Sequence, residues 1–310
     1  MVENVYSPPA LLFNRHLETI YPSLLRKVTF RKPTRERIET PDDDFLDLDW
    51  YRQGSSRCVI ISHGLEGNSQ RSYVLGMARA FFNEGFDVLA WNYRGCSGEM
   101  NRQLRFYHSG ATDDLHTVVT HASRHYPELY LVGFSLGGNL TLKYLGEGRA
   151  PEAVRRAVGI SVPLNLHTSC LAISKPSNWI YSQRFLRSLS AKVRAKPGLS
   201  KVVDVGKLNT LRTLFEFDDH FTGPLHGFKG AIDYYNRCSS IHSLPGITIP
   251  TLILNALNDP FLSEDCYPAT SNSKLILDYP ARGGHVGFAR FDRNNIYWSE
   301  MKALSFINAV

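Results

Sequence analysis

The chain has 310 residues, of which 43% are hydrophobic and 21% charged, a composition typical of a globular protein able to bury a sizeable core. The formal net charge of +6 comes from one segment, because seven basic and no acidic residues lie between Lys175 and Val203. That segment lacks the interleaved aromatic residues of a nucleic-acid module, so we expect a solvated face or an anion-facing flap and no nucleic-acid partner. The seven are Lys175, Arg184, Arg187, Lys192, Arg194, Lys196 and Lys201.

The cysteines and the N-terminal residues bear on location. Five cysteines are scattered without a C-x-x-C pair, which argues against a disulfide framework or a zinc knuckle and favours reduced thiols in a cytoplasmic protein. Arg15, His16 and Glu18 interrupt the apolar residues near the N-terminus, so we expect no signal-peptide core. No window approaches a transmembrane span, which leaves at most a peripheral contact with a membrane.

Short apolar runs bounded by Gly, Pro, Asn or Ser predict the strands. In chain order they lie at 45–51, 58–62, 86–91, 129–134, 154–161, 250–256 and 274–279. Helical patterns lie at 72–84, 112–125, 136–146 and 294–308. Because strands alternate with helices, we expect a mostly parallel sheet covered on both faces.

Two of these helices carry more detailed predictions. Thr112 is the expected N-cap of the helix at 112–125, since its side chain can accept a hydrogen bond from the first turn. In the closing helix, Tyr297, Met301 and Leu304 recur at i, i+4 and i+7. This spacing predicts that they form its apolar stripe.

One region breaks the alternation of strands and helices. From 163 to 245 the sequence mixes helical stretches with loops rich in Gly and Pro, which predicts a lid inserted into a single α/β domain. We therefore divide the chain into an N-terminal extension at 1–40, a core at 41–162 and 246–310, and a lid at 163–245. The extension is expected to pack near the lid or the sheet edge.

A serine lies at the corner between a predicted strand and a predicted helix. Residues 133–138 read Gly-Phe-Ser-Leu-Gly-Gly, and a Gly-x-Ser-x-Gly sequence in this context forms a turn so sharp that the serine backbone is strained. Gly133 and Gly137 leave room for neighbouring chain, and the following helix N-terminus favours developing negative charge. We interpret Ser135 as a catalytic nucleophile.

A serine nucleophile needs a base, and the base needs an orienting carboxylate. The chain contains eleven histidines, of which His285 is the expected base because it lies after the final predicted strand in a glycine-rich loop. Asp259 is the expected acid, since it follows the strand at 250–256 and the order Ser, acid, His suits this architecture. Asp278 is the alternative acid. The other acids considered, expected to be helix caps or solvated, are Asp113, Asp114, Asp218 and Asp219.

Two backbone N–H groups are expected to stabilise an oxyanion. One belongs to Leu136, directly after the nucleophile. The other belongs to Leu65, because the His-Gly pair at residues 63 and 64 is similar to the oxyanion motif of lipases and esterases. We expect His63 to brace this loop. The sequence holds no H-E-x-x-H, Walker or G-x-G-x-x-G motif, so we predict neither a metal nor another cofactor.

Several sequence blocks together resemble the AB hydrolase 4 family, the YheT-like esterases of the α/β-hydrolase superfamily. They are RHLETIYP, HGLEG, NYRGCSGE, GFSLGGN, EFDDHFTGPLHGF, DYYNRCSS, PTLILNALNDPF and GGHVGF. The resemblance implies an α/β-hydrolase fold with a helical lid and carboxylic-ester hydrolysis. It also implies Ser135, Asp259 and His285 as the charge-relay triad.

The predicted substrate is a small-molecule acyl ester or an acyl lipid, cleaved through an acyl-enzyme. Thioesterase, amidase and acyltransferase activity would use the same parts, so the acyl-group class stays open. A protein of another class, a catalytically idle ligand-binding module, could keep the same fold. The presence of all three triad residues weighs against that alternative.

Overall fold

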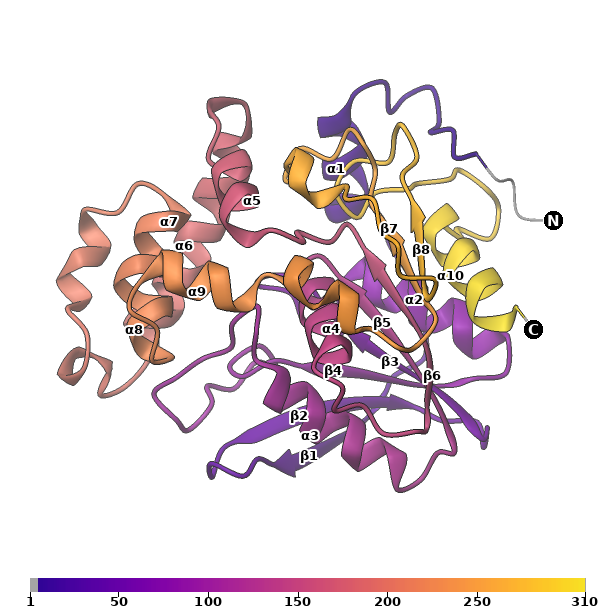
Figure 1. The fold of residues 1–310 in the computed structure, drawn as a ribbon, viewed down its shortest axis with the longest axis horizontal. Helices are drawn as coiled ribbons and strands as arrows, with labels where there is room; N and C mark the ends of the chain where they lie inside the picture. The colour runs from indigo at the N-terminus through magenta and orange to yellow at the C-terminus, as the bar shows by residue number, and fades with distance from the viewer. Residues whose placement is uncertain (1–4, 310) are drawn as a thin grey trace.

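The computed structural model describes residues 5–309, and its centre is an eight-stranded sheet in the order β1-β2-β4-β3-β5-β6-β7-β8 (Figure 1). The pairs β1/β2 and β2/β4 are antiparallel and the other neighbours are parallel. The strands are β1 (Thr34–Glu39), β2 (Phe45–Tyr51), β3 (Arg57–Ser62), β4 (Asp87–Asn92), β5 (Glu128–Phe134), β6 (Val154–Ile160), β7 (Thr251–Leu254) and β8 (Leu275–Asp278).

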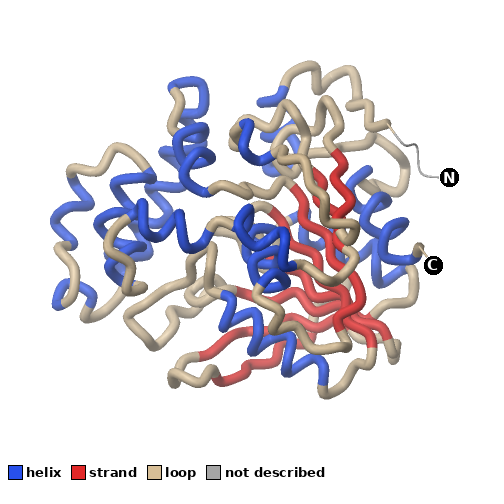
Figure 2. Tube along the Cα trace, in the orientation of Figure 1, coloured by secondary structure: helices blue, strands red, loops and turns tan. Residues whose placement is uncertain are grey.

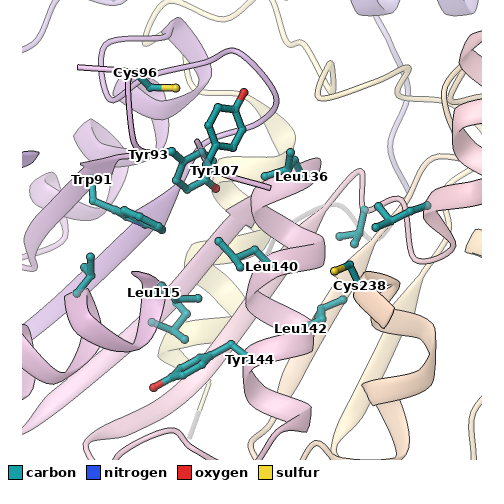
Figure 3. Packing of buried hydrophobic residues seen from close by; sticks show 14 of the residues in the cluster. Trp91, Tyr93, Cys96, Tyr107, Leu115, Leu136, Leu140, Leu142, Tyr144 and Cys238 are labelled. Carbon is teal, nitrogen blue, oxygen red and sulfur yellow. The ribbon is translucent and has the colours of Figure 1, made fainter. Parts of the chain in front are cut away.

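Helices cover both faces of this sheet. Helices α3 (Thr112–Ser123) and α4 (Leu136–Gly146) pack on one face, where Leu115, Leu140 and Leu142 join the larger core (Figure 3). Helices α2 (Ser72–Asn83) and α10 (Trp298–Asn308) contribute to a second core on the other face. Because both faces are covered, the central strands are apolar along their length. The predicted α/β-hydrolase fold is confirmed.

Residues 163–245, here called the insertion, lie to one side of the sheet. Between Ile160 and Thr251 the described chain forms no strand, as Figure 2 shows. Its α- and π-helical elements are α5 (Leu166–Ile173), α6 (Trp179–Ala195), α7 (Leu214–Phe217), a π-helix (Asp218–Thr222), α8 (Gly223–Leu225) and α9 (Ala231–Cys238). The short 3₁₀ helices in and after it are Pro176–Asn178, Leu199–Lys201, Val205–Asn209, Ser240–Gly246 and Glu264–Cys266.

Within residues 5–40 the structure describes one helix and one strand. Helix α1 (Arg15–Leu24) begins after Asn14, whose side chain accepts hydrogen bonds from two backbone N–H groups of the first turn. It packs against α2. Farther along, Arg26 forms a buried ion pair with Glu300 of α10 at 2.6 Å. The start of the chain is therefore tied to its end.

Several sequence predictions were wrong at this level. Strand β1 was missed, because its sequence, Thr-Arg-Glu-Arg-Ile-Glu, shows no apolar run. Helix α3 begins at Thr112 itself, with Ala111 as N-cap. Helix α10 begins at Trp298, because the Glu300 side chain accepts the Tyr297 N–H and closes a capping box. The buried residues of α10 are Trp298, Ser299, Glu300, Ala303 and Ile307; of the predicted stripe, Tyr297 is buried just before the helix, and Leu304 and Met301 are partly buried.

Two carboxylates that were expected to cap helices or face solvent are instead engaged in the interior. Asp114 is 3% exposed and accepts two hydrogen bonds from the buried guanidinium of Arg94. Asp218 accepts the Tyr235 hydroxyl at 2.6 Å. Its burial raises the pKa of Asp218 to about 6. Tertiary contacts that span many residues place both groups, so local pattern could not reveal them.

Candidate active site

The strand-to-helix corner holds Ser135 in a strained backbone conformation, with φ of 53° and ψ of −118°. Its N–H donates to the Ile160 carbonyl of the neighbouring strand at 2.8 Å. A Cβ at Gly133 would overlap the Gly137 backbone, and a Cβ at Gly137 would overlap the backbone of β3. The glycines therefore allow the close approach that turns the chain, and the hydroxyl lies at the first turn of α4.

The structure brings three predicted site residues together in one chain of hydrogen bonds. The Ser135 Oγ lies 2.9 Å from His285 Nε2. On the other side of the imidazole, His285 Nδ1 lies 2.8 Å from Asp259 Oδ2. In this arrangement the carboxylate can hold the Nδ1–H tautomer, which leaves Nε2 free to accept the serine proton.

Asp259 is held firmly in its loop. Its side chain is fully buried, and its second oxygen accepts the Phe261 N–H at 2.8 Å. The ring of Phe261 lies 4.3 Å from the His285 ring and covers it. The alternative acid, Asp278, lies at the end of β8 and pairs with Lys302 at 2.7 Å.

The loop that carries His285 depends on helix α1, which the sequence did not indicate. The His285 N–H donates to the Thr19 hydroxyl at 2.9 Å. The carboxylate of Glu18, 1% exposed, accepts the Gly283 N–H at 2.7 Å and the Arg282 Nε–H at 2.8 Å. Since Glu18 and Arg282 are 264 residues apart, no local sequence signal could have found this support.

The predicted oxyanion loop is a tight turn directly above the serine. The Gly67 N–H donates to the Gly64 carbonyl at 3.0 Å, so Leu65 occupies the second position of the turn. A Cβ at Gly64 would lie 3.3 Å from the Ser135 Cβ. The turn is thus close enough for its backbone to reach an atom bound to the serine, which keeps Leu65 and Leu136 as the predicted donors.

His63 is a buried residue that connects this turn to the sheet. Its Nδ1 lies 2.8 Å from the Gly64 carbonyl, and its Nε2 accepts the Tyr93 N–H at 3.3 Å. Burial lowers the pKa of His63 to about 3. The imidazole is therefore neutral, as its acceptor role requires, and it supports the loop.

Two cavities, of about 230 and 140 Å³, meet at the serine. The larger one opens between α1, the predicted oxyanion loop and α6, where Leu24, Ile180 and Arg184 form part of its wall. The smaller one extends beneath the insertion toward Cys170 and Asp218. The residues lining both are Leu65, Ser135, Phe185, Phe261 and His285.

Among residues 5–309, no group of three or more His, Cys, Asp or Glu side chains could hold a metal ion. Within the same range, no helix is both long enough and apolar enough to cross a bilayer.

Comparisons with known proteins agree with this architecture. Residues 57–273 match the family described as alpha/beta hydrolase fold. The chain is 36% identical over 289 residues to "Putative esterase YheT" of Escherichia coli strain K12, covering 89% of this chain and 84% of that protein. It is 30% identical over 301 residues to phospholipase ABHD3 of Homo sapiens, covering 87% and 74%.

A third relative is the monoacylglycerol lipase of Saccharomyces cerevisiae, 30% identical over 273 residues that cover 84% of this chain and 60% of that protein. Among solved structures, the esterase Pf2001 of Pyrococcus furiosus is similar in fold, with a TM-score of 0.61 at 14% identity and coverage of 91% and 95%. The family match and the 36% identity over most of both chains decide the classification. The chain belongs to the α/β-hydrolase superfamily, among the YheT-like esterases.

Proposed function

We propose that this carboxylic ester hydrolase works through a Ser-His-Asp triad. Ser135 is the nucleophile, His285 the general base and acid, and Asp259 the orienting carboxylate. The observation that carries the proposal is the unbroken hydrogen-bond chain from Ser135 Oγ through His285 to Asp259, with distances of 2.9 and 2.8 Å, at the meeting point of two cavities.

The reaction follows from this arrangement. Ser135 attacks the acyl carbonyl while His285 Nε2 takes its proton, and the Leu65 and Leu136 N–H groups stabilise the tetrahedral oxyanion. His285 then returns the proton to the leaving alcohol, which gives an acyl-enzyme. A water molecule, activated by the same imidazole, hydrolyses that ester and frees the serine.

The proposed substrates are small acyl esters or acyl lipids. The relatives' names include an esterase, a phospholipase and a monoacylglycerol lipase, and these all describe enzymes that act on esters. Apolar side chains of the insertion, among them Tyr181, Phe185 and Leu189, line the cavities beside the serine. We therefore propose that the insertion acts as a lid over the acyl group, and that 1–40 is an extension that supports the site. The cytoplasmic location stays a prediction.

Labelling with a fluorophosphonate tests the mechanism. The probe forms a tetrahedral adduct on an activated serine and uses the same oxyanion donors as an ester, so we expect stoichiometric labelling confined to Ser135 by peptide mass spectrometry. Ser135→Ala should abolish labelling, and His285→Ala should slow it by several orders of magnitude. The rate of p-nitrophenyl butyrate hydrolysis should likewise be abolished in Ser135→Ala and be lowered by several orders of magnitude in His285→Ala.

Two results would contradict the proposal. A folded protein that neither reacts with the probe nor hydrolyses simple esters would favour the ligand-binding module. Hydrolysis that survives Ser135→Ala would place the nucleophile elsewhere. Circular dichroism of each variant serves as the control for folding.

A further inference from the structure

The turn that holds the proposed oxyanion donor contains a strained residue. Glu66, the third residue of the turn, has φ of 53°. Turns with a positive φ at this position usually carry glycine or asparagine there, because a larger L-residue pays a steric cost. A glutamate in this conformation needs contacts elsewhere that outweigh the cost.

Those contacts come from two different parts of the chain. The Glu66 N–H donates to the Tyr107 hydroxyl, which in turn donates to Glu66 Oε1, both at 2.8 Å. From helix α6 of the insertion, Lys192 Nζ donates to Oε1 at 2.7 Å and the Ser188 hydroxyl donates to Oε2 at 2.5 Å. Glu66 therefore joins the turn both to the core and to α6.

The attraction between the Glu66 carboxylate and the Lys192 ammonium strengthens the contact between the turn and α6. The side chains of Glu66 and Lys192 are only 9% and 12% exposed, so water screens their attraction weakly. Burial alone would raise the pKa of Glu66, but the Lys192 charge and the three side-chain donors hold it below its ordinary value. The ammonium also lies 5.0 Å from the Tyr107 ring centre and 3.3 Å from the Cys96 sulfur.

We propose that Glu66 is a positioning residue, and that its contacts with α6 keep the oxyanion turn in its working conformation while the insertion lies over the site. The inference rests on the proposed function, because its consequence for rate concerns the donor Leu65. A rotation about φ of Glu66 would move the adjoining Leu65 backbone. The position of α6 and the conformation of the oxyanion turn are thereby coupled.

The contacts also predict which kinetic constant responds. Stabilisation of an oxyanion acts on the transition state, so its loss lowers kcat while leaving ground-state binding nearly unchanged. Neither Ser188 nor Lys192 belongs to the turn, yet removing either should disturb it. A residue that merely anchored α6 would alter binding or folding instead.

The experiment combines kinetics with hydrogen exchange on the full chain. The variants are Glu66→Gln, Lys192→Met and Ser188→Ala, with Lys302→Met as the matched control, because Lys302 forms a similar part-buried pair with Asp278 at 2.7 Å away from the site. For p-nitrophenyl butyrate we expect kcat to fall roughly 10- to 100-fold in Glu66→Gln and Lys192→Met, with KM within about twofold. The double variant, Glu66→Gln with Lys192→Met, should have a kcat close to that of Glu66→Gln alone, because the two residues act as one unit.

Hydrogen exchange separates this inference from the proposed function. Peptides covering residues 63–67 should exchange faster in Lys192→Met and in Ser188→Ala, and at the parental rate in Lys302→Met. Unchanged exchange, or a change in KM with kcat preserved, would overturn the positioning role. Ser188→Ala removes a single hydroxyl, so it keeps the test valid if the charge variants fold poorly. If the parent protein shows no hydrolysis that depends on Ser135, that result would instead count against the proposed triad.

Discussion

Ser135 is strained in the backbone and exposed to the cavities, and both properties depend on glycines two positions away. Side chains at Gly133 or Gly137 would overlap neighbouring backbone, so the sharp turn is possible only with hydrogen at these positions. This requirement is local. A short motif in a strand-to-helix context is therefore enough to predict the corner, and the structure has the corner as predicted.

The choice of acid can be tested at the same scale. Asp259→Asn should lower kcat by on the order of 10⁴, as loss of the orienting carboxylate does in the serine-protease triad, because the imidazole then takes the wrong tautomer. Asp278→Asn should leave kcat within about twofold, since Asp278 contacts Lys302 and not His285. Steady-state hydrolysis of p-nitrophenyl butyrate by both variants decides between them. The reverse ranking would move the acid to Asp278.

The basic residues in and around helix α6 lie in different environments, although the sequence suggests one uniformly charged segment. Of the seven basic residues between Lys175 and Val203, Lys192 pairs with Glu66 and Lys196 is buried, where it donates to Asn101 Oδ1 at 3.0 Å. The other five are exposed. The expectation of a solvated or anion-facing segment is therefore wrong for two of the seven residues, which hold α6 in place.

The remaining charge on α6 leads to a prediction about substrates. Arg184 lines the larger cavity, whereas the equally exposed Arg187 does not. Arg184→Gln should raise KM for an anionic ester about twofold to fivefold, the size expected for one exposed charge, and leave a neutral ester of equal length unaffected. The difference should shrink as salt is added. Equal responses by Arg184→Gln and Arg187→Gln would argue against a role for this side chain in recognition.

Elements with strong local patterns were predictable, and elements that depend on tertiary contacts were not. The apolar runs of β2 to β8 predicted strands to within one or two residues at each end. The charged sequence of β1 becomes a strand because it pairs with β2, where Arg35 and Arg37 meet Asp49 and Asp47. In α6, Trp179 is 58% exposed and absent from the walls of both cavities, whereas its neighbour Ile180 lines the larger one, a difference set by the turn of the helix.

Histidines whose pKa is lowered in the fold make the stability of the whole molecule depend on pH. Burial lowers the pKa of His63, His108 and His226, so the fold keeps all three neutral while the unfolded chain can protonate them. Their contribution to stability is present above the unfolded pKa of about 6.5 and is lost as the pH falls toward the folded values. Asp218 acts in the opposite direction, since its raised pKa of about 6 favours the fold below pH 4.

The pKa of His16 is lowered as well, so four such histidines oppose one carboxyl, and the free energy of unfolding should fall between pH 6.5 and 4.5. His63→Asn should reduce that slope by up to about 1.4 kcal/mol per pH unit, the value for one proton. Urea unfolding followed by circular dichroism at several pH values measures it, and the exposed His242, changed to Asn, provides the comparison. An identical slope in His63→Asn and the parent would show that His63 takes up its proton in the fold.

At the same scale, the sequence predicted the residues of the site but not what supports them. Ser135 and Asp259 each lie within hydrogen-bond distance of His285, and all three lie in local motifs that let the sequence nominate them; their catalytic roles stay a proposal. Glu18, Thr19 and Glu66 support that site through contacts with distant segments. No local sequence pattern predicts these contacts, because their partners lie in distant segments.

The hydrogen bonds between helix α1 and the loop at 282–285 also determine when the site can form during synthesis. Glu18 leaves the ribosome early, but its partners at 282 and 283 are added 264 or more residues later. Until then, α1 can pack against α2, but the Glu18 carboxylate lacks its partners at 282 and 283. The nascent chain can build most of its sheet beforehand, yet His285 acquires its support only when the segment at 282–285 folds back onto α1. The arrangement proposed for catalysis therefore requires that residues 282–285 have been synthesised and have folded against α1.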